Sequence, residues 1–163
     1  MSVFNEENTV EEYVRDLLTP LWAFVSPEEL GRADDAVFAV DRLKDSLIRL
    51  NPSIEENPDR VEDILYRLRA IILSVRSDGL VKANEEFSAW LSGDRSMPFG
   101  SDGEHVTIRL IDFDDLSNND YVVTTQYRFT GKGQTRIPDV VLLVNGMPLI
   151  VVEAKTPTRD CVS

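Results

Sequence analysis

The chain has 163 residues, which is the length of one domain. Its hydrophobic content of 42% and mean hydropathy of −0.18 are those of a soluble globular protein, and its longest apolar runs, 140–144 and 149–152, are far too short to cross a bilayer. The formal charge of −12 at pH 7 counts against a stand-alone nucleic-acid-binding protein, which normally carries a basic surface. The N-terminus, Met1 to Glu11, has neither the basic nor the apolar region of a signal peptide, and a single cysteine, Cys161, cannot form an internal disulfide, so we expect a cytoplasmic protein.

Residues 1–95 are predicted to be mainly helical. Apolar residues at helical spacing predict helices over Glu7 to Leu18, Asp41 to Leu50 and Val81 to Leu91. The sequence Ser26-Pro27-Glu28-Glu29 predicts the start of a further short helix, because it combines an N-cap, a proline at the first helical position and first-turn acids. The strongest pattern follows Asn57-Pro58, where the apolar residues on one face are Val61, Ile64, Leu65, Leu68, Ile71 and Ile72.

After a turn-rich joint over 93–103 the apolar pattern changes to period two, and residues 104–155 are predicted to form a β-sheet. One strand alternates Val106, Ile108 and Leu110 with polar residues, and a second places Val123, Thr125, Tyr127 and Phe129 on one face. Pro138 to Val144 and Leu149 to Val152 are apolar on both faces, which is typical of central strands covered on both sides. Helices followed by such a sheet predict an α+β fold.

A β-hairpin is predicted at Asn145-Gly146, because both residues tolerate a positive φ. A three-residue loop would pair Val144 with Pro148 and would set Asp139 opposite Glu153. A two-residue loop would put the two carboxylates on opposite faces, since a slip of one residue turns every side chain over. If the two carboxylates share an ion, the turn must therefore hold an odd number of residues, or a bulge must correct the register. Lys155 lies two residues after Glu153 and therefore on the same face.

Two carboxylates a few ångströms apart repel each other by about 4 kcal/mol at an intermediate dielectric, so a close pair calls for a cation. Oxygen ligands at incomplete coordination suit Mg²⁺, which lowers the pKa of bound water and makes it a nucleophile for a phosphodiester. Lys155 could orient that water or neutralise charge that develops on phosphorus. Each residue also has a simpler explanation: an Asp after Pro often begins a strand, and Glu-x-Lys at a strand end is often a solvated pair. Beside very apolar strands, however, the three together are costly to bury without a compensating role.

At these residues the chain resembles the nuclease domain of type I restriction enzyme R subunits. The similarity is specific from about Thr107 to Pro157. The motifs that carry it are Leu110-Ile111-Asp112-Phe113-Asp114, Asn118-Asn119-Asp120, Gln126-Tyr127-Arg128-Phe129, Ile137-Pro138-Asp139, Val144-Asn145-Gly146-Met147-Pro148-Leu149 and Glu153-Ala154-Lys155, with a fainter echo in Arg42-Leu43 and Leu50-Asn51-Pro52.

The resemblance implies a restriction-endonuclease-like mixed sheet with N-terminal helices packed on it, and a PD-(D/E)xK endonuclease that cleaves double-stranded DNA with Mg²⁺. It implies that Asp139, Glu153 and the backbone carbonyl of Ala154 are metal ligands and that Lys155 is the catalytic lysine. It also implies a supporting carboxylate on the first helix. The best match is Glu11, and its rivals are Glu6, Glu7 and Glu12.

Such R subunits continue into an ATP-driven translocase, but this chain has no Gly-x-x-x-x-Gly-Lys-Ser/Thr motif, so any use of ATP belongs to a longer parent enzyme. We therefore expect residues 1–163 to be a single nuclease domain truncated at its C-terminus, with 156–163 a cut-off linker. The expected partners are double-stranded DNA and the methyltransferase and specificity subunits of a restriction complex. Lys132, Arg136 and Arg128 could touch DNA, or could simply be solvated. Two alternatives stay open: a non-catalytic nuclease-like module that docks other subunits, and another DNA nuclease of the same fold.

Overall fold

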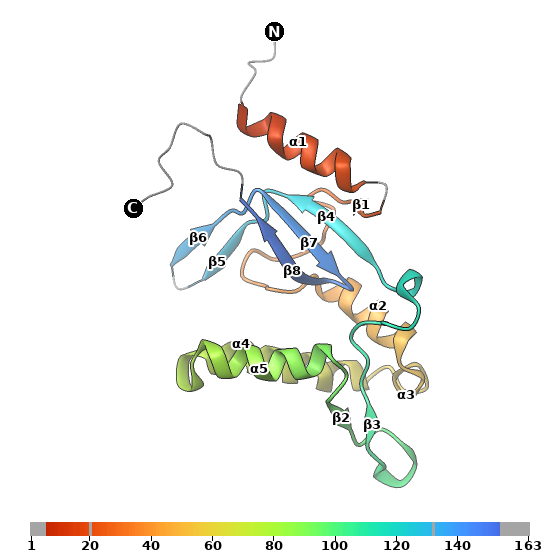
Figure 1. The fold of residues 1–163 in the computed structure, drawn as a ribbon. Coiled ribbons are helices and arrows are strands. Elements are labelled where there is room, and N and C mark those ends of the chain that lie inside the picture. Colours follow the sequence, from red (N-terminus) through yellow and green to blue (C-terminus); the bar gives the residue numbers. More distant parts are fainter. Residues whose placement is uncertain (1–5, 20, 132, 154–163) are drawn as a thin grey trace. The chain divides into compact units, whose positions relative to one another are not determined.

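The structure is a computed structural model that describes residues 6–19, 21–131 and 133–153, without the side chains of residues 6–11. The chain forms two compact units. Unit 1 consists of Met1–Asp41 and Asp120–Ser163, and unit 2 consists of Arg42–Asn119. Figure 1 shows the elements of both. No helix in the described residues is both long enough and apolar enough to cross a membrane.

Unit 1 is built on a four-stranded mixed sheet with the order β1-β4-β7-β8. The strands are β1 (Ala23–Phe24), β4 (Tyr121–Thr125), β7 (Val140–Val144) and β8 (Met147–Val152). The pair β1 and β4 is parallel, and the pairs β4–β7 and β7–β8 are antiparallel. The α+β prediction is therefore consistent with the mixed sheet and the separate helices.

Both faces of the two central strands, β4 and β7, are covered. Helix α1 (Glu6–Leu18) packs beside the sheet, as Figure 1 shows. On that face Val14, Leu18 and Trp22 contact Val123, Val140 and Leu142. The other face is covered by the segment between β1 and α2, where Val25, Leu30 and Ala39 pack against Val122, Val141 and Leu143. All five residues of β7 are buried, which confirms the predicted central strand.

The prediction of a second central strand over Leu149 to Val152 is wrong. In the described part of the chain β8 is an edge strand, and the side chains of Ile150 and Val151 are 49% and 57% exposed. Pro148 fits this position because proline has no N–H to donate to a further strand. An apolar run alone therefore does not show whether a strand lies at the edge or in the centre of a sheet.

The predicted strand from Val123 to Phe129 is broken in two, which corrects that expectation. Gln126 has a φ of 51°, and this left-handed conformation ends β4. The chain then forms a separate two-stranded ribbon of β5 (Phe129–Gly131) and β6 (Gln134–Arg136). Figure 1 shows this ribbon beyond the end of the four-stranded sheet.

Ser26 and Glu29 form the predicted capping contacts, but no helix follows. The Ser26 hydroxyl accepts a hydrogen bond from the Glu29 N–H at 3.3 Å, and the Glu29 carboxylate accepts one from the Ser26 N–H at 3.4 Å. Gly31 then adopts a φ of 66°, so helical backbone cannot continue. The segment is a hydrogen-bonded turn.

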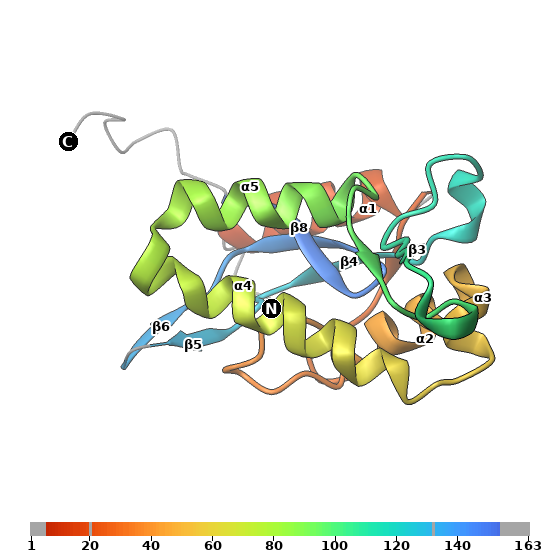
Figure 2. The same cartoon turned by 90° about the horizontal axis from the view of Figure 1, so that it is seen from below.

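Unit 2 carries three further predicted helices, and these are confirmed: α2 (Val40–Leu50), which begins in unit 1, α4 (Arg60–Asp78) and α5 (Leu80–Leu91). A short helix that was not predicted, α3 (Pro52–Glu55), follows α2. Figure 2 shows α4 and α5 side by side, joined through Gly79. The buried core includes Leu43, Leu47, Ile54, Ile64, Leu65 and Leu68. The remaining elements are β2 (Ser96–Met97), β3 (Val106–Thr107) and two short 3₁₀ helices, η1 (Ser101–Gly103) and η2 (Leu116–Asn118).

The loop that follows Asp112 is held by hydrogen bonds to the Asp112 carboxylate. The buried Asp112 side chain accepts hydrogen bonds from the backbone N–H groups of Asp114 and Asp115, each at 3.1 Å, and from the Asn118 amide at 3.0 Å. Arg109 contributes an ion pair at 3.2 Å. These contacts lower the pKa of Asp112, chiefly through the Asn118 hydrogen bond and the backbone donors. The motif Asp112–Asn119 therefore has a structural role within unit 2.

Candidate active site

The turn of the β7–β8 hairpin has two residues. Asn145 and Gly146 have φ angles of 52° and 78°, and Val144 pairs with Met147. Of the two loop lengths that the sequence leaves open, the structure therefore has the two-residue one. Two successive residues with positive φ form a turn whose twist matches that of the flanking strands, and Asn-Gly is the sequence best suited to it.

This turn is buried and held from several sides. The Asn145 side-chain oxygen accepts a hydrogen bond from the Asp120 N–H at 2.7 Å, and the Asn145 N–H donates to the Asp120 carbonyl at 2.8 Å. The Gly146 carbonyl accepts a hydrogen bond from the Ala39 N–H at 2.9 Å. The hairpin is thus fixed at its closed end by contacts within unit 1.

A β-bulge corrects the register that the two-residue turn sets. Leu143 pairs with Pro148, but Leu142 pairs with Ile150, so Leu149 is left without an opposite residue. The pairing then runs on to Val140 and Val152. Continued by one residue, this register sets Asp139 opposite Glu153. The expected juxtaposition of the two carboxylates is therefore supported, although it is reached by a different backbone geometry.

Asp139 is held at the start of β7 by backbone contacts. Its carbonyl accepts a hydrogen bond from the Gln126 N–H at 3.0 Å, and the neighbouring Pro138 carbonyl accepts one from the Tyr127 N–H at 3.2 Å. Asp139 is half-buried and Glu153 is exposed. The pair thus joins a half-buried acid whose backbone is held in place to an acid that is exposed.

A second network, around Tyr127, supports this region, and its partners Val37 and Arg32 were not predicted from the sequence. The Tyr127 hydroxyl donates to the Val37 carbonyl at 2.7 Å, and the Arg32 guanidinium lies 3.8 Å from the centre of the Tyr127 ring. Arg32 also donates to the carbonyls of Ala36 and Arg128. Burial raises the pKa of Tyr127 to about 12, although the nearby Arg32 charge opposes the shift. Tyr127 is therefore a neutral anchor beside Pro138 and Asp139.

Several predicted site residues cannot be placed. Ala154, Lys155 and Lys132 lie outside the described residues, and Glu11 lies in α1 with its side chain undescribed. Among the side chains that the structure does describe, no three His, Cys, Asp or Glu residues come together as a metal site. The described part of the candidate site is therefore the pair Asp139 and Glu153.

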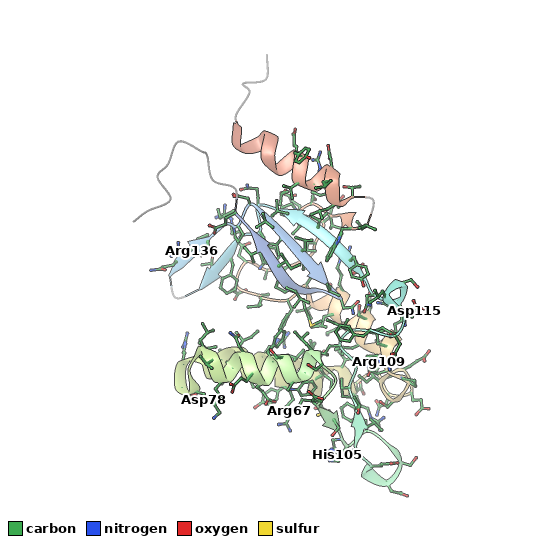
Figure 3. All side chains as sticks on the ribbon, in the orientation of Figure 1. Arg67, Asp78, His105, Arg109, Asp115 and Arg136 are labelled. Carbon is green, nitrogen blue, oxygen red and sulfur yellow. The ribbon has the colours of Figure 1, made fainter. Side chains whose placement is uncertain are left out.

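The two candidate DNA-contacting arginines that the structure describes differ in their surroundings. The Arg128 guanidinium lies 3.9 Å from the Asp34 carboxylate, and the Arg128 backbone carbonyl accepts a hydrogen bond from Arg32. Arg136 is exposed on β6, where Figure 3 labels it. Within the described residues it forms no ion pair.

Comparison with known proteins identifies the family. Residues 3–162 match the sequence model described as "Type I restriction enzyme R protein N terminus". The chain is 30% identical, over 94% of its length, to the "Type I restriction enzyme HindI endonuclease subunit" of Haemophilus influenzae. It is 26% identical, over 72% of its length, to the "Putative type I restriction enzyme MjaIXP endonuclease subunit" of Methanocaldococcus jannaschii.

The chain spans only 15% and 12% of the length of these two relatives. No solved structure was found to match it. The family match covers nearly all of the sequence and includes the hairpin with Asp139 and Glu153. The chain therefore belongs to the family of type I restriction enzyme R protein N-termini.

Proposed function

We propose that this chain is the DNA-cleaving part of a type I restriction enzyme, a Mg²⁺-dependent endonuclease domain of the PD-(D/E)xK class with a restriction-endonuclease-like fold. The observation that carries the proposal is the bulge at Leu149, because it gives β7 and β8 a register that, continued by one residue, sets Asp139 opposite Glu153. Opposite residues of an antiparallel pair share a face, with Cβ atoms about 5 Å apart. The names of the two relatives, both endonuclease subunits, support the same reading.

The donors on this hairpin fit a magnesium ion. Asp139 and Glu153 offer hard oxygen ligands on neighbouring strands, and Mg²⁺ is typically held by one or two carboxylates while it keeps several waters. A half-buried carboxylate beside an exposed one also leaves the site open to a substrate phosphate. By family resemblance, the Ala154 carbonyl and the Glu11 carboxylate would complete the protein ligands.

The bound metal would supply a water of lowered pKa and a positive charge for the phosphate oxygen. The protein itself contributes first by holding the ligand residues in position. The backbone hydrogen bonds from Gln126 and Tyr127 fix the strand that carries Asp139. Glu153 would hold the ion together with Asp139, and Lys155, two residues further on in the sequence, would neutralise charge that develops on the scissile phosphate. ATP-driven translocation would belong to the rest of a longer parent enzyme, together with its methyltransferase and specificity subunits.

Magnesium titration of matched variants tests the proposal. We expect Asp139→Asn and Glu153→Gln each to weaken Mg²⁺ binding at least about tenfold and to abolish cleavage of duplex DNA. The double variant should lose little more than either single one, because the two carboxylates act on one ion. Asp35→Asn is the control: Asp35 is an exposed acid of unit 1, and its substitution makes the same charge change. Equal Mg²⁺ affinity in all four variants would refute the shared site.

A docking module without nuclease activity is the second candidate. It is favoured by the exposed apolar side chains of Ile150 and Val151 on β8, which is an edge strand within the described residues. On that reading a metal-independent complex with another restriction subunit would form. Asp139→Asn and Glu153→Gln would leave that complex unchanged. The unmodified chain would not cleave DNA, so no variant could reduce cleavage.

A further inference from the structure

The ribbon of β5 and β6 lies in the one stretch of unit 1 where basic residues gather without acids. Residues 128–138 contain Arg128, Lys132 and Arg136 and no Asp or Glu, in a chain whose formal charge is −12. The flanking polar residues are Thr130, Gln134 and Thr135, which hydrogen-bond without adding negative charge. A local basic surface of this kind is what an otherwise acidic protein needs in order to approach a polyanion.

The two faces of the ribbon differ. Thr130 pairs with Thr135, and their hydroxyl oxygens are 3.0 Å apart on one face. The opposite face carries the pairs Phe129 with Arg136 and Gly131 with Gln134. Position 131 leaves room for the Phe129 ring, since a Cβ there would lie 3.1 Å from it. This second face therefore displays Gln134 and Arg136 beside a ring, and all three residues of β6 are exposed.

The ribbon is anchored on its β5 side. The Thr130 N–H donates to the Asp34 carbonyl at 2.8 Å, and Arg32 donates to the Arg128 carbonyl. The two ends of the ribbon are joined by the hydrogen bonds from Gln126 and Tyr127 to Asp139 and Pro138. Within the described residues no further strand pairs with β6, so β6 is the side available to a ligand.

This anchoring fixes the ribbon relative to the candidate site. Arg136 precedes Asp139 by three residues, so their Cα atoms are at most about 10 Å apart. The axial rise of B-DNA is about 3.4 Å per nucleotide, so the two residues can contact phosphates within about three nucleotides of each other along the axis. A duplex that contacts Arg136 can therefore also present a phosphate to Asp139.

We propose that the β5–β6 ribbon is a DNA-holding element, which contacts the backbone of duplex DNA through the Gln134–Arg136 face and so places a phosphate at Asp139. The major groove of B-DNA admits a two-stranded ribbon, and arginine is well suited to bind phosphate. Arg136 has the main role, because within the described residues it has no acidic partner, whereas Arg128 lies near Asp34. The ribbon proposal rests on the proposed function for its ligand, duplex DNA.

The test is the binding of a fluorescent duplex to this chain without divalent metal, over a range of salt concentrations. We expect Arg136→Gln to weaken binding about tenfold at low salt and to reduce the slope of log K against log[salt] by about 0.9, the value for one phosphate contact. Arg136→Lys should restore most of the binding and the slope, because it keeps the charge. Arg128→Gln should cause a smaller loss than Arg136→Gln.

Arg76→Gln is the matched control. It makes the same charge change on an exposed residue in the last turn of α4, outside the ribbon, and should leave affinity within about twofold. The circular dichroism spectrum and the unfolding midpoint of each variant check that it is folded. Loss of binding in Arg136→Gln but not in Arg76→Gln supports the ribbon. Equal affinities for these two variants, or no binding of duplex by the unmodified chain at low salt, overturn it.

A Mg²⁺-dependent cleavage assay distinguishes failure of the ribbon proposal from failure of the proposed nuclease function. If Mg²⁺-dependent cutting is lost in Asp139→Asn while Arg136→Gln binds and cuts normally, only the ribbon proposal fails. If Arg136 controls binding but no cutting occurs with Mg²⁺, only the nuclease proposal fails.

Discussion

Val140 pairs with Val152 across a hairpin whose turn, Asn145-Gly146, has only two residues. An unbroken ladder from that turn would pair Val140 with Val151 instead. The difference is the single residue Leu149, which has no opposite residue in β7. With Leu149 present, Asp139 can approach Glu153 only if this extra residue is bulged out of the pairing, and changes in the length of β8 can test this.

Shortening β8 by one residue should have little effect on Mg²⁺ binding, whereas lengthening it by one residue should weaken Mg²⁺ binding. Deletion of Leu149 removes the bulge but keeps Leu142 opposite Ile150, so Asp139 stays opposite Glu153 and Mg²⁺ affinity should change by less than about threefold. Insertion of one alanine after Leu149 moves Glu153 out of register and should weaken Mg²⁺ binding at least about tenfold. Isothermal titration of both variants measures this. Equal effects of the deletion and the insertion would contradict the register described here.

Backbone irregularities of this kind are the part of the fold that the sequence did not predict. The helices α2, α4 and α5 followed from apolar spacing, because each of them buries one face. The Asn-Gly turn was also predictable. A bulge was one of the alternatives, but its position was not predictable, since Leu149 differs in no local property from its apolar neighbours and is selected by the cross-strand partners it must fit. The break at Gln126 was missed for a similar reason: glutamine has no strong preference for positive φ, and the hydrogen bonds to Asp139 and Pro138 hold it there.

Asn145 should be important for the stability of the hairpin. Asn145→Ala imposes a positive φ on a residue with a Cβ and leaves the Asp120 N–H without its side-chain acceptor, so we expect a loss of about 2–4 kcal/mol in the free energy of unfolding. Asn145→Gly removes only the hydrogen bond and should lose less. Urea unfolding measures both, and an Ala variant as stable as the Gly variant would show that the turn is not strained.

Asp112 should make unit 2 sensitive to acid. Its pKa is lowered in the folded chain, chiefly by the Asn118 hydrogen bond, so its charged form stabilises the fold above the ordinary Asp pKa, and this stabilisation is lost as the pH falls through the folded value. Asp112→Asn should therefore be less stable than the unmodified chain at neutral pH. The difference between the two should shrink as the pH falls below about 3.9. Chemical denaturation at a series of pH values measures it. A difference that is constant with pH would exclude a charge effect.

Glu11 is expected to support the metal from α1. It precedes Val14 by three residues, and Val14 contacts the sheet, so helical spacing favours Glu11 over its neighbour Glu12. We expect Glu11→Gln to weaken Mg²⁺ binding by about tenfold or more and to slow cleavage, while Glu12→Gln, with the same charge change, leaves both intact. The reverse order of effects would assign the supporting carboxylate to Glu12. No effect of either variant would remove α1 from the site.

Lys155 should act on the reaction and not on the metal. Without Mg²⁺ its ammonium would pair with Glu153, and the ion would take over the carboxylates and free the lysine for the scissile phosphate. An interaction made mainly in the transition state contributes to the rate more than to binding. For the parent enzyme we therefore expect Lys155→Ala to abolish cutting while Mg²⁺ affinity, unfolding midpoint and DNA affinity stay nearly unchanged. Lys155→Arg should also fail, because a planar guanidinium cannot replace a compact ammonium on one water or phosphate oxygen.

Glu153→Gln, by contrast, should lose both metal binding and cutting. A normal cutting rate in Lys155→Ala would make the lysine a solvated residue after β8, and the match to the nuclease motif at that position would then carry no function.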